Sequence, residues 1–264
     1  MKFSKIDKQL IGKELLFPIF TEAGHVWVNN IPLELRDIET LKLEGFTHVF
    51  IKEESVVDIR HAQELIAPLQ PHISPKLYET LRMLLKTSGD FRVLVSAIQE
   101  YDEKTFRHSL TTAQTAIAMC EKNGCGELDI LRVAIAALLH DVGKCCIPIT
   151  LLNRTGVLDE RARWLMEKHV WYSYLVLSFV WDSDLAVLAY THHERVDGTG
   201  YPRKLHGDEI SELSKIIIMS DVFSALTEIR AYKEAYEVNT ALEIICSCFS
   251  EEKQLCAVLQ EVVS

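Results

Sequence analysis

The sequence predicts a mainly α-helical bundle preceded by a small α/β domain. Three observations lead to this fold class. Residues 76–264 contain one helix-like segment after another, with apolar side chains recurring at intervals of three and four. Residues 1–70 instead show short apolar runs separated by turn residues, which is typical of strands. Between the two parts, residues 67–75 contain three prolines, and this composition predicts a linker.

The N-terminal domain is expected to contain strands and a single helix. Leu15–Phe20 and His25–Val28 are predicted strands around the turn at residues 22–24. Pro32–Glu44 is a predicted helix that Gly45 ends, and Thr47–Ile51 is a further strand. No ligand motif is visible in this domain, so we expect a regulatory or dimerising role for it.

The helical part is predicted from apolar periodicity and from residues that end helices. The segment Leu128–Asp141 is almost wholly apolar, which predicts a buried central helix. A glycine-rich loop, residues 196–203, interrupts the helices. The predicted helices are Leu77–Glu100 with a break at residues 88–90, Thr105–Asn123, Leu128–Asp141, Leu158–Val180, Asp184–Tyr190, Ile210–Glu228, Asn239–Cys248 and Glu251–Val262.

Charge and cysteine content exclude several functional classes. The formal net charge is −10, so the average field repels DNA, RNA and anionic membranes. A phosphate site in such a chain needs metal ions or clustered cations. The seven cysteines include no CxxC pair, which predicts reduced thiols in a cytoplasmic protein and argues against a zinc ribbon. We find no targeting segment, and residues 170–181, the most apolar stretch, are too few to span a membrane.

Several ionisable residues interrupt apolar helices. His140 and Asp141 close a long apolar run, Asp221 lies inside another, and His169 falls on the apolar face of its helix. Each alone is explained as a core histidine or as a paired or capping carboxylate. An ionised carboxylate in such a place is costly without a partner, however, and several such residues on successive helices can converge in a bundle. Together they predict a metal site.

Imidazole and carboxylate ligands without thiolates suit iron, manganese or zinc. A carboxylate such as Asp141 can bridge two metals, and a hydroxide held between them is a nucleophile at neutral pH. Lys144 lies about one helical turn after His140 and can supply a proton or screen a phosphate oxygen. Its alternative interpretation is a solvated lysine at a helix C-terminus.

Two motifs resemble those of a known family. Residues 140–144, HDVGK, resemble the motif of the HD phosphohydrolase superfamily. Residues 192–202, HHERVDGTGYP, match every fixed position of the HHExxDGxGYP signature of HD-GYP domains. The resemblance extends over about residues 100–250 and implies an HD-domain helical bundle for residues 76–264, with the α/β domain at 1–70.

The resemblance also implies a site. Two divalent metals are expected, iron or alternatively manganese, with Asp141 bridging them and Lys144 beside the bridging hydroxide. Arg230 and Lys233 would contact the phosphate and guanine of the ligand, and the loop residues Gly198, Gly200, Tyr201 and Pro202 would shape the pocket edge. The metal ligands implied are His108, His140, Asp141, His169, His192, His193 and Asp221.

The sequence departs from the family pattern at several positions. Lys104 replaces a glutamate that binds a third metal in some members, and Glu103 is one residue away from that position, so we predict two metals. Ser224 replaces the usual aspartate, and Ala231 the usual proline. Ser173 replaces a frequent glycine, a change we expect to narrow the pocket or shift its helix. These departures bear on substrate fit more than on metal binding.

The function implied is hydrolysis of cyclic di-GMP to pGpG, to GMP, or to both. One alternative substrate is another cyclic dinucleotide, such as 3′,3′-cyclic GMP-AMP. A second alternative is a non-catalytic receptor for a cyclic dinucleotide or for a signalling protein that binds the GYP loop. A phosphohydrolase of mononucleotides fits less well, because the loop signature is complete. A homodimer is a further expectation.

Overall fold

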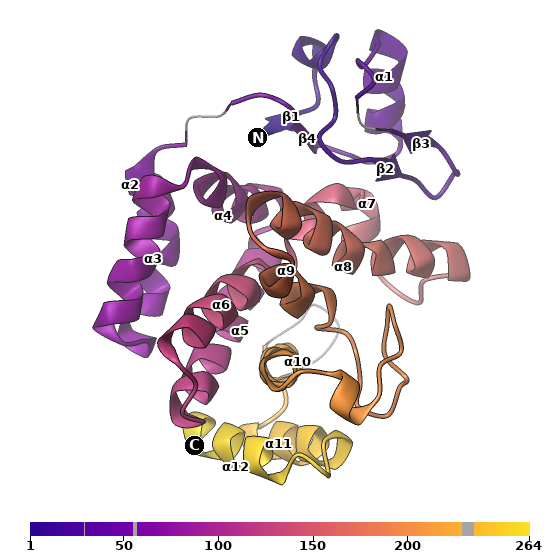
Figure 1. Ribbon diagram of the computed structural model, residues 1–264. Helices are drawn as coiled ribbons and strands as arrows, with labels where there is room; N and C mark the ends of the chain where they lie inside the picture. Colours follow the sequence, from indigo (N-terminus) through magenta and orange to yellow (C-terminus); the bar gives the residue numbers. More distant parts are fainter. Residues whose placement is uncertain (29, 55–56, 229–234) are drawn as a thin grey trace.

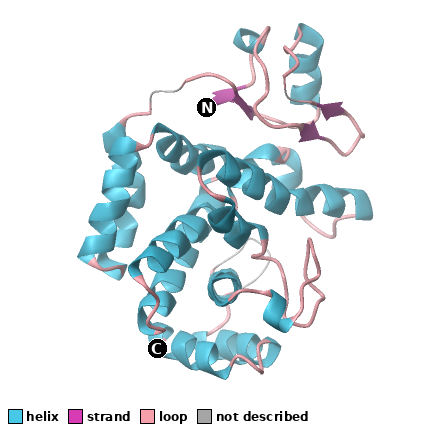
Figure 2. Cartoon of the chain, in the orientation of Figure 1, coloured by secondary structure: helices cyan, strands magenta, loops and turns pink. Residues whose placement is uncertain are grey.

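The computed structural model describes residues 1–28, 30–54, 57–228 and 235–264 (Figure 1). Helices dominate this part of the chain, and its strands all lie within the first 51 residues (Figure 2). The predicted fold class, a helical bundle preceded by a small α/β unit, is confirmed.

The N-terminal unit consists of short strands and one α-helix around a small core. Strand β1 (Lys2–Lys5) pairs antiparallel with β4 (His48–Ile51), and β2 (Ile19–Phe20) pairs antiparallel with β3 (Val26–Trp27). Helix α1 (Leu35–Leu43) is within the range predicted for it, and Leu41 is fully buried in the unit's core. Strand β1 was not predicted, because two of its four residues are lysines and Phe3 is the one apolar residue in the run KFSK.

The proline-containing segment differs from the linker that was expected. Helix α2 (Ile59–Ile66) continues directly into a 3₁₀ helix, η2 (Ala67–His72), and α3 (Pro75–Thr87) starts at the third of the prolines. Proline is compatible with the first turn of a helix, because the amide hydrogens of that turn have no partner within the helix. Leu69 is fully buried in the main core. Pro68 and Pro75 therefore lie at helix starts and Pro71 inside η2, so the segment is not an extended connection.

The remaining described chain is helical, and the predicted helices are confirmed with small shifts at their ends. Ser88 separates α3 from α4 and accepts a hydrogen bond from Phe91 N–H, so the predicted break is also confirmed. Helix α2, the short α7 and the 3₁₀ helices η3 and η4 were not predicted. The elements are α4 (Gly89–Tyr101), α5 (Glu103–Lys122), α6 (Glu127–Leu139), η3 (Val142–Cys146), α7 (Ile149–Leu152), α8 (Glu160–Val180), α9 (Ser183–Tyr190), η4 (Gly207–Glu209), α10 (Glu212–Thr227), α11 (Val238–Cys248) and α12 (Lys253–Val263).

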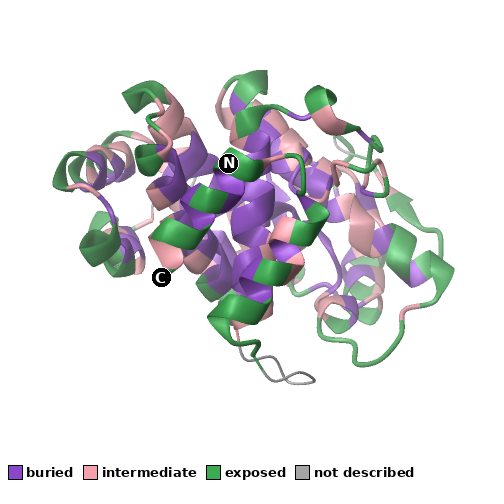
Figure 3. Cartoon of the chain, turned by 90° about the horizontal axis from the view of Figure 1, so that it is seen from below, coloured by how far each residue is buried: buried purple, intermediate pink, exposed green. Residues whose placement is uncertain are grey.

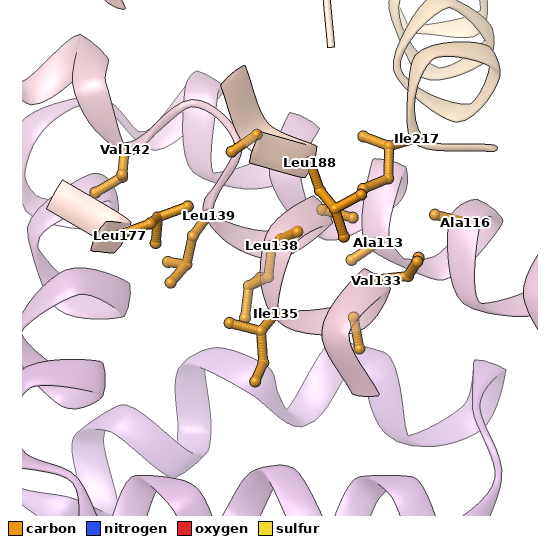
Figure 4. Packing of buried hydrophobic residues seen from close by; sticks show 14 of the residues in the cluster. Ala113, Ala116, Val133, Ile135, Leu138, Leu139, Val142, Leu177, Leu188 and Ile217 are labelled. Carbon is orange, nitrogen blue, oxygen red and sulfur yellow. The ribbon is translucent and has the colours of Figure 1, made fainter. Parts of the chain in front are cut away.

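Helix α6 is the centre of the bundle. Every residue from Val133 to Leu139 is buried, as its apolar sequence predicts. Figure 4 shows its side chains packed among Ala113 and Ala116 of α5, Leu188 of α9 and Ile217 of α10. The outer helices instead bury one face and expose the other (Figure 3). The C-terminus of α6 is thereby fixed inside the protein.

The N-terminal unit lies against the segment that follows α6. The amide of Ile149 in α7 donates to the carbonyl of Gly45 at 3.0 Å. The amide of Phe20 donates to the hydroxyl of Tyr172 on α8 at 3.2 Å, and the ring of Phe20 also packs on Trp171. Figure 1 shows the unit, in indigo, beside α7 and α8. The small unit and the bundle therefore share a packed boundary.

Candidate metal centre

The structure brings all seven predicted ligand residues together from different elements. His108 lies on α5, His169 on α8 and Asp221 on α10. His140 ends α6 and Asp141 begins η3, so the two occupy the turn between these elements. His192 and His193 follow the end of α9. Six of the seven residues are buried, and His193 is partly exposed.

Six of the seven side chains form two adjoining groups, and Asp221 lies against the second through His108, 2.8 Å away. One group is His169, His192 and His193, and the other is His108, His140 and Asp141; within each, the candidate ligand atoms lie within 4.8 Å of one another. Asp141 Oδ1 is 3.4 Å from His169 Nε2, and Asp141 Oδ2 is 3.4 Å from His140 Nε2. The two oxygens of one carboxylate therefore face the two groups, the arrangement that a bridging ligand needs.

Three of the histidines are oriented by backbone carbonyls. In each, Nδ1 lies within hydrogen-bond distance of the carbonyl three residues earlier, which can only accept, so Nδ1 carries the proton and Nε2 presents a lone pair to the centre. The pairs are His140 with Ala137 at 2.8 Å, His169 with Met166 at 2.7 Å and His192 with Ala189 at 2.5 Å.

The protonation of the donors suits a metal. Burial lowers the pKa of His169 to about 4 and that of His192 to about 3, and burial holds the pKa of His193 well below its usual value. These imidazoles are neutral at pH 7. Burial would raise the pKa of Asp141, but the charges of Lys144 and His140 outweigh it and keep this pKa well below the usual range. Neutral imidazole and ionised carboxylate are the forms that bind divalent ions.

His108 and Asp221 form a close pair on the α5–α10 side of the centre. His108 Nε2 is 2.8 Å from Asp221 Oδ1. Burial would lower the pKa of His108, but hydrogen bonds to Asp221 and Glu228 outweigh it and raise this pKa to about 9. Burial would likewise raise the pKa of Asp221, whereas its hydrogen bond and charge interaction with His108 hold it well below the usual range.

Two buried atoms at the centre have no hydrogen-bond partner among the described residues. They are His140 Nε2 and Asp141 Oδ1, which face the two groups of donors. A buried lone pair without a partner is rare in folded proteins because leaving it unsatisfied is costly. A divalent ion in each group would satisfy both atoms, and a nitrogen and oxygen donor set without sulfur suits iron, manganese or zinc. The residues present therefore fit a two-metal centre.

Lys144 is directed at the carboxylate of Asp141. Its ammonium forms an ion pair with Asp141 Oδ2, and its side chain is only 22% exposed. The alternative interpretation of a solvated lysine at a helix end does not describe this geometry. The side chain brings a positive charge to the edge of the donor cluster.

The turn that carries His140 and Asp141 packs closely against α8 and is hydrogen-bonded to it. A Cβ atom on Gly143 would lie 2.0 Å from the carbonyl oxygen of His169, so only glycine allows this approach. Ser173 is fully buried; its hydroxyl donates to the carbonyl of His140 at 2.6 Å and accepts from the amide of Gly143 at 2.9 Å. Ser173 was expected to narrow the pocket or shift its helix, and the structure instead shows it fastening this turn.

The loop at residues 196–203 lies beside His193. The ring of Tyr201 packs against the ring of His193, with centroids 4.8 Å apart and an interplanar angle of 33°. Gly198 has a φ of +77°. A Cβ atom on Gly200 would lie 2.4 Å from the amide nitrogen of Arg195. The two glycines allow the chain to fold back so that Tyr201 borders the centre, whereas Pro202 is exposed.

Glu194, within the same signature, holds this loop in place. Its side chain is fully buried, and its two oxygens accept the amides of Arg203 at 2.7 Å and Leu205 at 2.9 Å. The signature contains this glutamate, but the sequence alone assigned no role to it. Glu194 thus acts on the loop through backbone hydrogen bonds and not on the metal groups.

Two further predictions concern the residues expected to contact the ligand and the position at which some family members bind a third metal. Arg230, Ala231 and Lys233 lie outside the described residues. Glu103 faces the surface, where it accepts from Arg107 Nε at 3.0 Å, and Lys104 is exposed, so this turn of α5 directs no carboxylate at the centre.

Two further residues bear on the site. Ser224 is fully buried, and its hydroxyl has no partner among the described residues. Glu228, which sequence reasoning missed, contacts His108 Nδ1 at 3.2 Å. Its spacing of seven residues from Asp221 was the available signal, since residues seven apart share a helix face.

Comparison with known proteins agrees with the fold and the motifs. The HD domain family matches residues 92–248, which is more than half of the chain. The chain belongs to the HD domain family. The family resemblance recognised in residues 140–144 and 192–202 is thereby confirmed. Among the described residues of this HD domain chain, no helix is long and apolar enough to cross a membrane.

Curated relatives of the HD domain chain include proteins named as cyclic di-GMP phosphodiesterases and proteins named as 3′3′-cGAMP-specific phosphodiesterases. The cyclic di-GMP phosphodiesterase response regulator RpfG of Xanthomonas campestris pv. campestris is 36% identical over 238 residues, covering 88% of this chain and 60% of the relative. The 3′3′-cGAMP-specific phosphodiesterase 3 of Vibrio cholerae is 32% identical over 197 residues, covering 74% of this chain and 41% of the relative. The chain thus spans 41% and 60% of the lengths of these two proteins.

Solved structures share the fold at low sequence identity. Bd1817, an HDG"Y"P protein from Bdellovibrio bacteriovorus, aligns with a TM-score of 0.53 at 15% identity and covers 99% of each chain. The HD domain of the L. monocytogenes phosphodiesterase PgpH aligns with a TM-score of 0.50 at 16% identity, covering 64% of this chain and 94% of that domain. At these identities the likeness concerns the fold alone.

Proposed function

We propose that this HD domain chain is a metal-dependent phosphodiesterase that hydrolyses cyclic di-GMP. The observation that carries the proposal is the largely buried cluster of six donors in two groups, with the two Asp141 oxygens facing them and Asp221 beside His108. Such a cluster serves metal-assisted hydrolysis of phosphate esters better than any role in packing, because two of its buried atoms, His140 Nε2 and Asp141 Oδ1, have no partner among the described residues. The names of the relatives indicate the substrate class.

The proposed cofactor is a pair of divalent ions, iron or alternatively manganese. His108, His140 and Asp221 would hold one ion, the three histidines of the other group would hold the second, and Asp141 would contact both. Bound in this way, the ions would supply Lewis acidity and an activated water for attack on phosphorus. His169, His192 and His193 are already neutral and Asp141 and Asp221 already ionised. His108, whose pKa is raised to about 9, would have to lose a proton when the ion binds.

The protein's own residues would place and neutralise the substrate. Hydrolysis adds one water across a P–O bond of the ring, giving linear pGpG, and a second hydrolysis gives two molecules of GMP. The Lys144 ammonium, beside Asp141, can offset negative charge that develops on a phosphoryl oxygen or donate a proton to the departing ribose oxygen. Tyr201 and Pro202 would border the bound nucleotide, while Arg230 and Lys233 would contact its phosphate and guanine.

The second candidate substrate is 3′,3′-cyclic GMP-AMP. Three relatives specific for this dinucleotide in name are 29–32% identical to the chain, close to the identities of the cyclic di-GMP relatives. A non-catalytic receptor is less well supported, because all seven donors and Lys144 are retained. We further propose that residues 1–70 form a regulatory or dimerising domain of a cytoplasmic protein and that the GYP loop contacts signalling proteins.

The test is a substrate panel assayed with anaerobically prepared protein loaded with Fe(II) or Mn(II). Cyclic di-GMP, 3′,3′-cyclic GMP-AMP and a deoxynucleoside triphosphate are incubated separately, and pGpG, GMP and other products are separated chromatographically. We expect cyclic di-GMP to be converted and the conversion to be lost in Asp141→Ala. Turnover of cyclic GMP-AMP alone would favour the second candidate. Binding of either dinucleotide without turnover, despite two bound metals, would show that the protein is a receptor and not an enzyme.

A further inference from the structure

His108 differs from the other oriented histidines of the centre. His140, His169 and His192 each donate Nδ1–H to a backbone carbonyl three residues earlier. His108 instead directs Nδ1 at a carboxylate, that of Glu228, which is 120 residues away in the sequence. The distance from His108 Nδ1 to Glu228 Oε2 is 3.2 Å, and the carboxylate can only accept, so Nδ1 donates.

Helix capping does not explain where Glu228 lies. The residue is the C-cap of α10, and the carbonyl end of a helix repels negative charge. Two further carboxylates, Asp141 and Asp221, lie in the same cluster and add to the repulsion. One oxygen of Glu228, Oε1, is buried and has no hydrogen-bond partner among the described residues. A favourable contact must offset these costs, and His108 provides the one contact that the structure describes for this side chain.

The geometry points to Glu228 as a positioning residue that holds Nδ1–H of His108 and so directs Nε2 of the same ring into the metal centre. This inference rests on the proposed two-metal site. A carboxylate that accepts the distal N–H of a ligand histidine fixes the tautomer, orients the ring and makes the ligand nitrogen more basic. In this chain Glu228 would do for His108 what three backbone carbonyls do for the other histidines.

The test measures Mn(II) binding to metal-free protein by calorimetric titration, without substrate. Glu228→Met keeps the length of the side chain but removes the acceptor, whereas Glu228→Gln keeps an amide oxygen that can accept the same hydrogen bond. We expect Glu228→Met to weaken one of two Mn(II) affinities about 10- to 100-fold and to leave the other unchanged. Glu228→Gln should recover most of this loss.

The matched control is Glu243→Met on α11, an exposed glutamate outside the site, which should bind Mn(II) as the unmodified chain does. Circular dichroism of the metal-free variants checks that each is folded. If Glu228→Met does not fold, Glu228→Ala takes its place in the same comparison with Glu228→Gln. Unchanged Mn(II) affinities in the folded variant that lacks the acceptor would overturn the inference.

A double-mutant cycle separates positioning from direct ligation. In a His108→Ala background, Glu228→Met should cause no further loss of Mn(II) affinity, since Glu228 acts through His108. A further loss would show that Glu228 binds the ion itself, and would overturn the positioning role. Unmodified protein that binds no Mn(II) would instead refute the metal centre of the proposed function, so the two failures are distinct.

Discussion

Buried ionisable side chains in this chain are stabilised by specific partners. Glu194 is a clear example, because both of its carboxylate oxygens accept backbone amides of the loop that follows. An ionised carboxylate without such partners would be strongly disfavoured at a position with no exposure. The same requirement applies to Asp141, where Lys144 and the surrounding imidazoles supply the compensation. Each buried charge therefore indicates a structural or chemical task.

Replacing Glu194 should loosen the loop without removing a candidate metal ligand. Glu194→Ala leaves the amides of Arg203 and Leu205 without their acceptor, and we expect a loss of about 2–4 kcal/mol in the free energy of unfolding. Urea denaturation of the metal-free protein measures this loss. Glu194→Gln should lose less, because its amide oxygen can keep one of the two hydrogen bonds. An alanine variant as stable as the unmodified chain would refute this role.

The contact between η3 and α8 positions the turn that carries His140 and Asp141. Gly143 lets the backbone of η3 approach α8 closely, and the hydroxyl of Ser173 links the His140 carbonyl to the Gly143 amide. His169 lies one turn earlier on the same helix, so one packing contact fixes donors of both metal groups relative to each other.

Ser173→Ala tests this contact between elements. The variant removes the hydroxyl that bridges two buried backbone groups, and we expect the free energy of unfolding to fall by about 1–3 kcal/mol. Ser173→Gly should show a similar loss, because the hydroxyl and not the methylene makes both hydrogen bonds. Thermal and urea denaturation provide the measurement. Stability equal to that of the unmodified chain in both variants would contradict the assigned contact.

At the scale of the whole molecule, the N-terminal unit packs against α7 and α8, and α8 carries His169 of the metal centre. Gly45 lies close to Thr150 of α7, and the carbonyl of Gly45 accepts a hydrogen bond from the amide of Ile149. Phe20 contacts Tyr172, which lies one turn after His169 on α8. A change in the packing of this unit against α8 would therefore shift the helix that carries His169.

Gly45→Ala should disturb this boundary. Gly45 has a φ of +88°, and an added Cβ would lie 2.0 Å from Thr150 Oγ1, so we expect destabilisation of about 1–3 kcal/mol. The double variant Gly45→Ala/Thr150→Ala should recover part of the loss, because it removes the clashing hydroxyl. Differential scanning calorimetry measures both. A single variant that unfolds at the same temperature as the unmodified chain would show that this boundary is not tightly packed.

The sequence predicted the helices of the bundle better than the connections between them. Helices α6 and α8 follow from long apolar patterns with clear ends, and these patterns survive in the packed core. The prolines of residues 67–75 misled the prediction, because proline is common both in linkers and in the first turn of helices. Strand β1 was missed because pairing with β4, a long-range contact, stabilises a segment with little apolar character.

Sequence motifs likewise predicted the donors better than the residues that support them. Residues 140–141 and 192–193 stand in recognisable motifs, and the structure brings them together as expected. Glu228 and Ser173 belong to no fixed motif position. Their contacts join residues 120 and 33 apart in the sequence, so only the folded chain reveals them.

The most direct test of the two-metal phosphodiesterase is a titration of metal-free protein with Mn(II) under anaerobic conditions, with cyclic di-GMP hydrolysis measured at each step. We expect no turnover without metal, and turnover that reaches its maximum when two ions are bound per chain. Asp141→Ala should stay inactive at every metal concentration. Hydrolysis that persists after complete metal removal, or that reaches its maximum with a single bound ion, would rule out the two-metal phosphodiesterase.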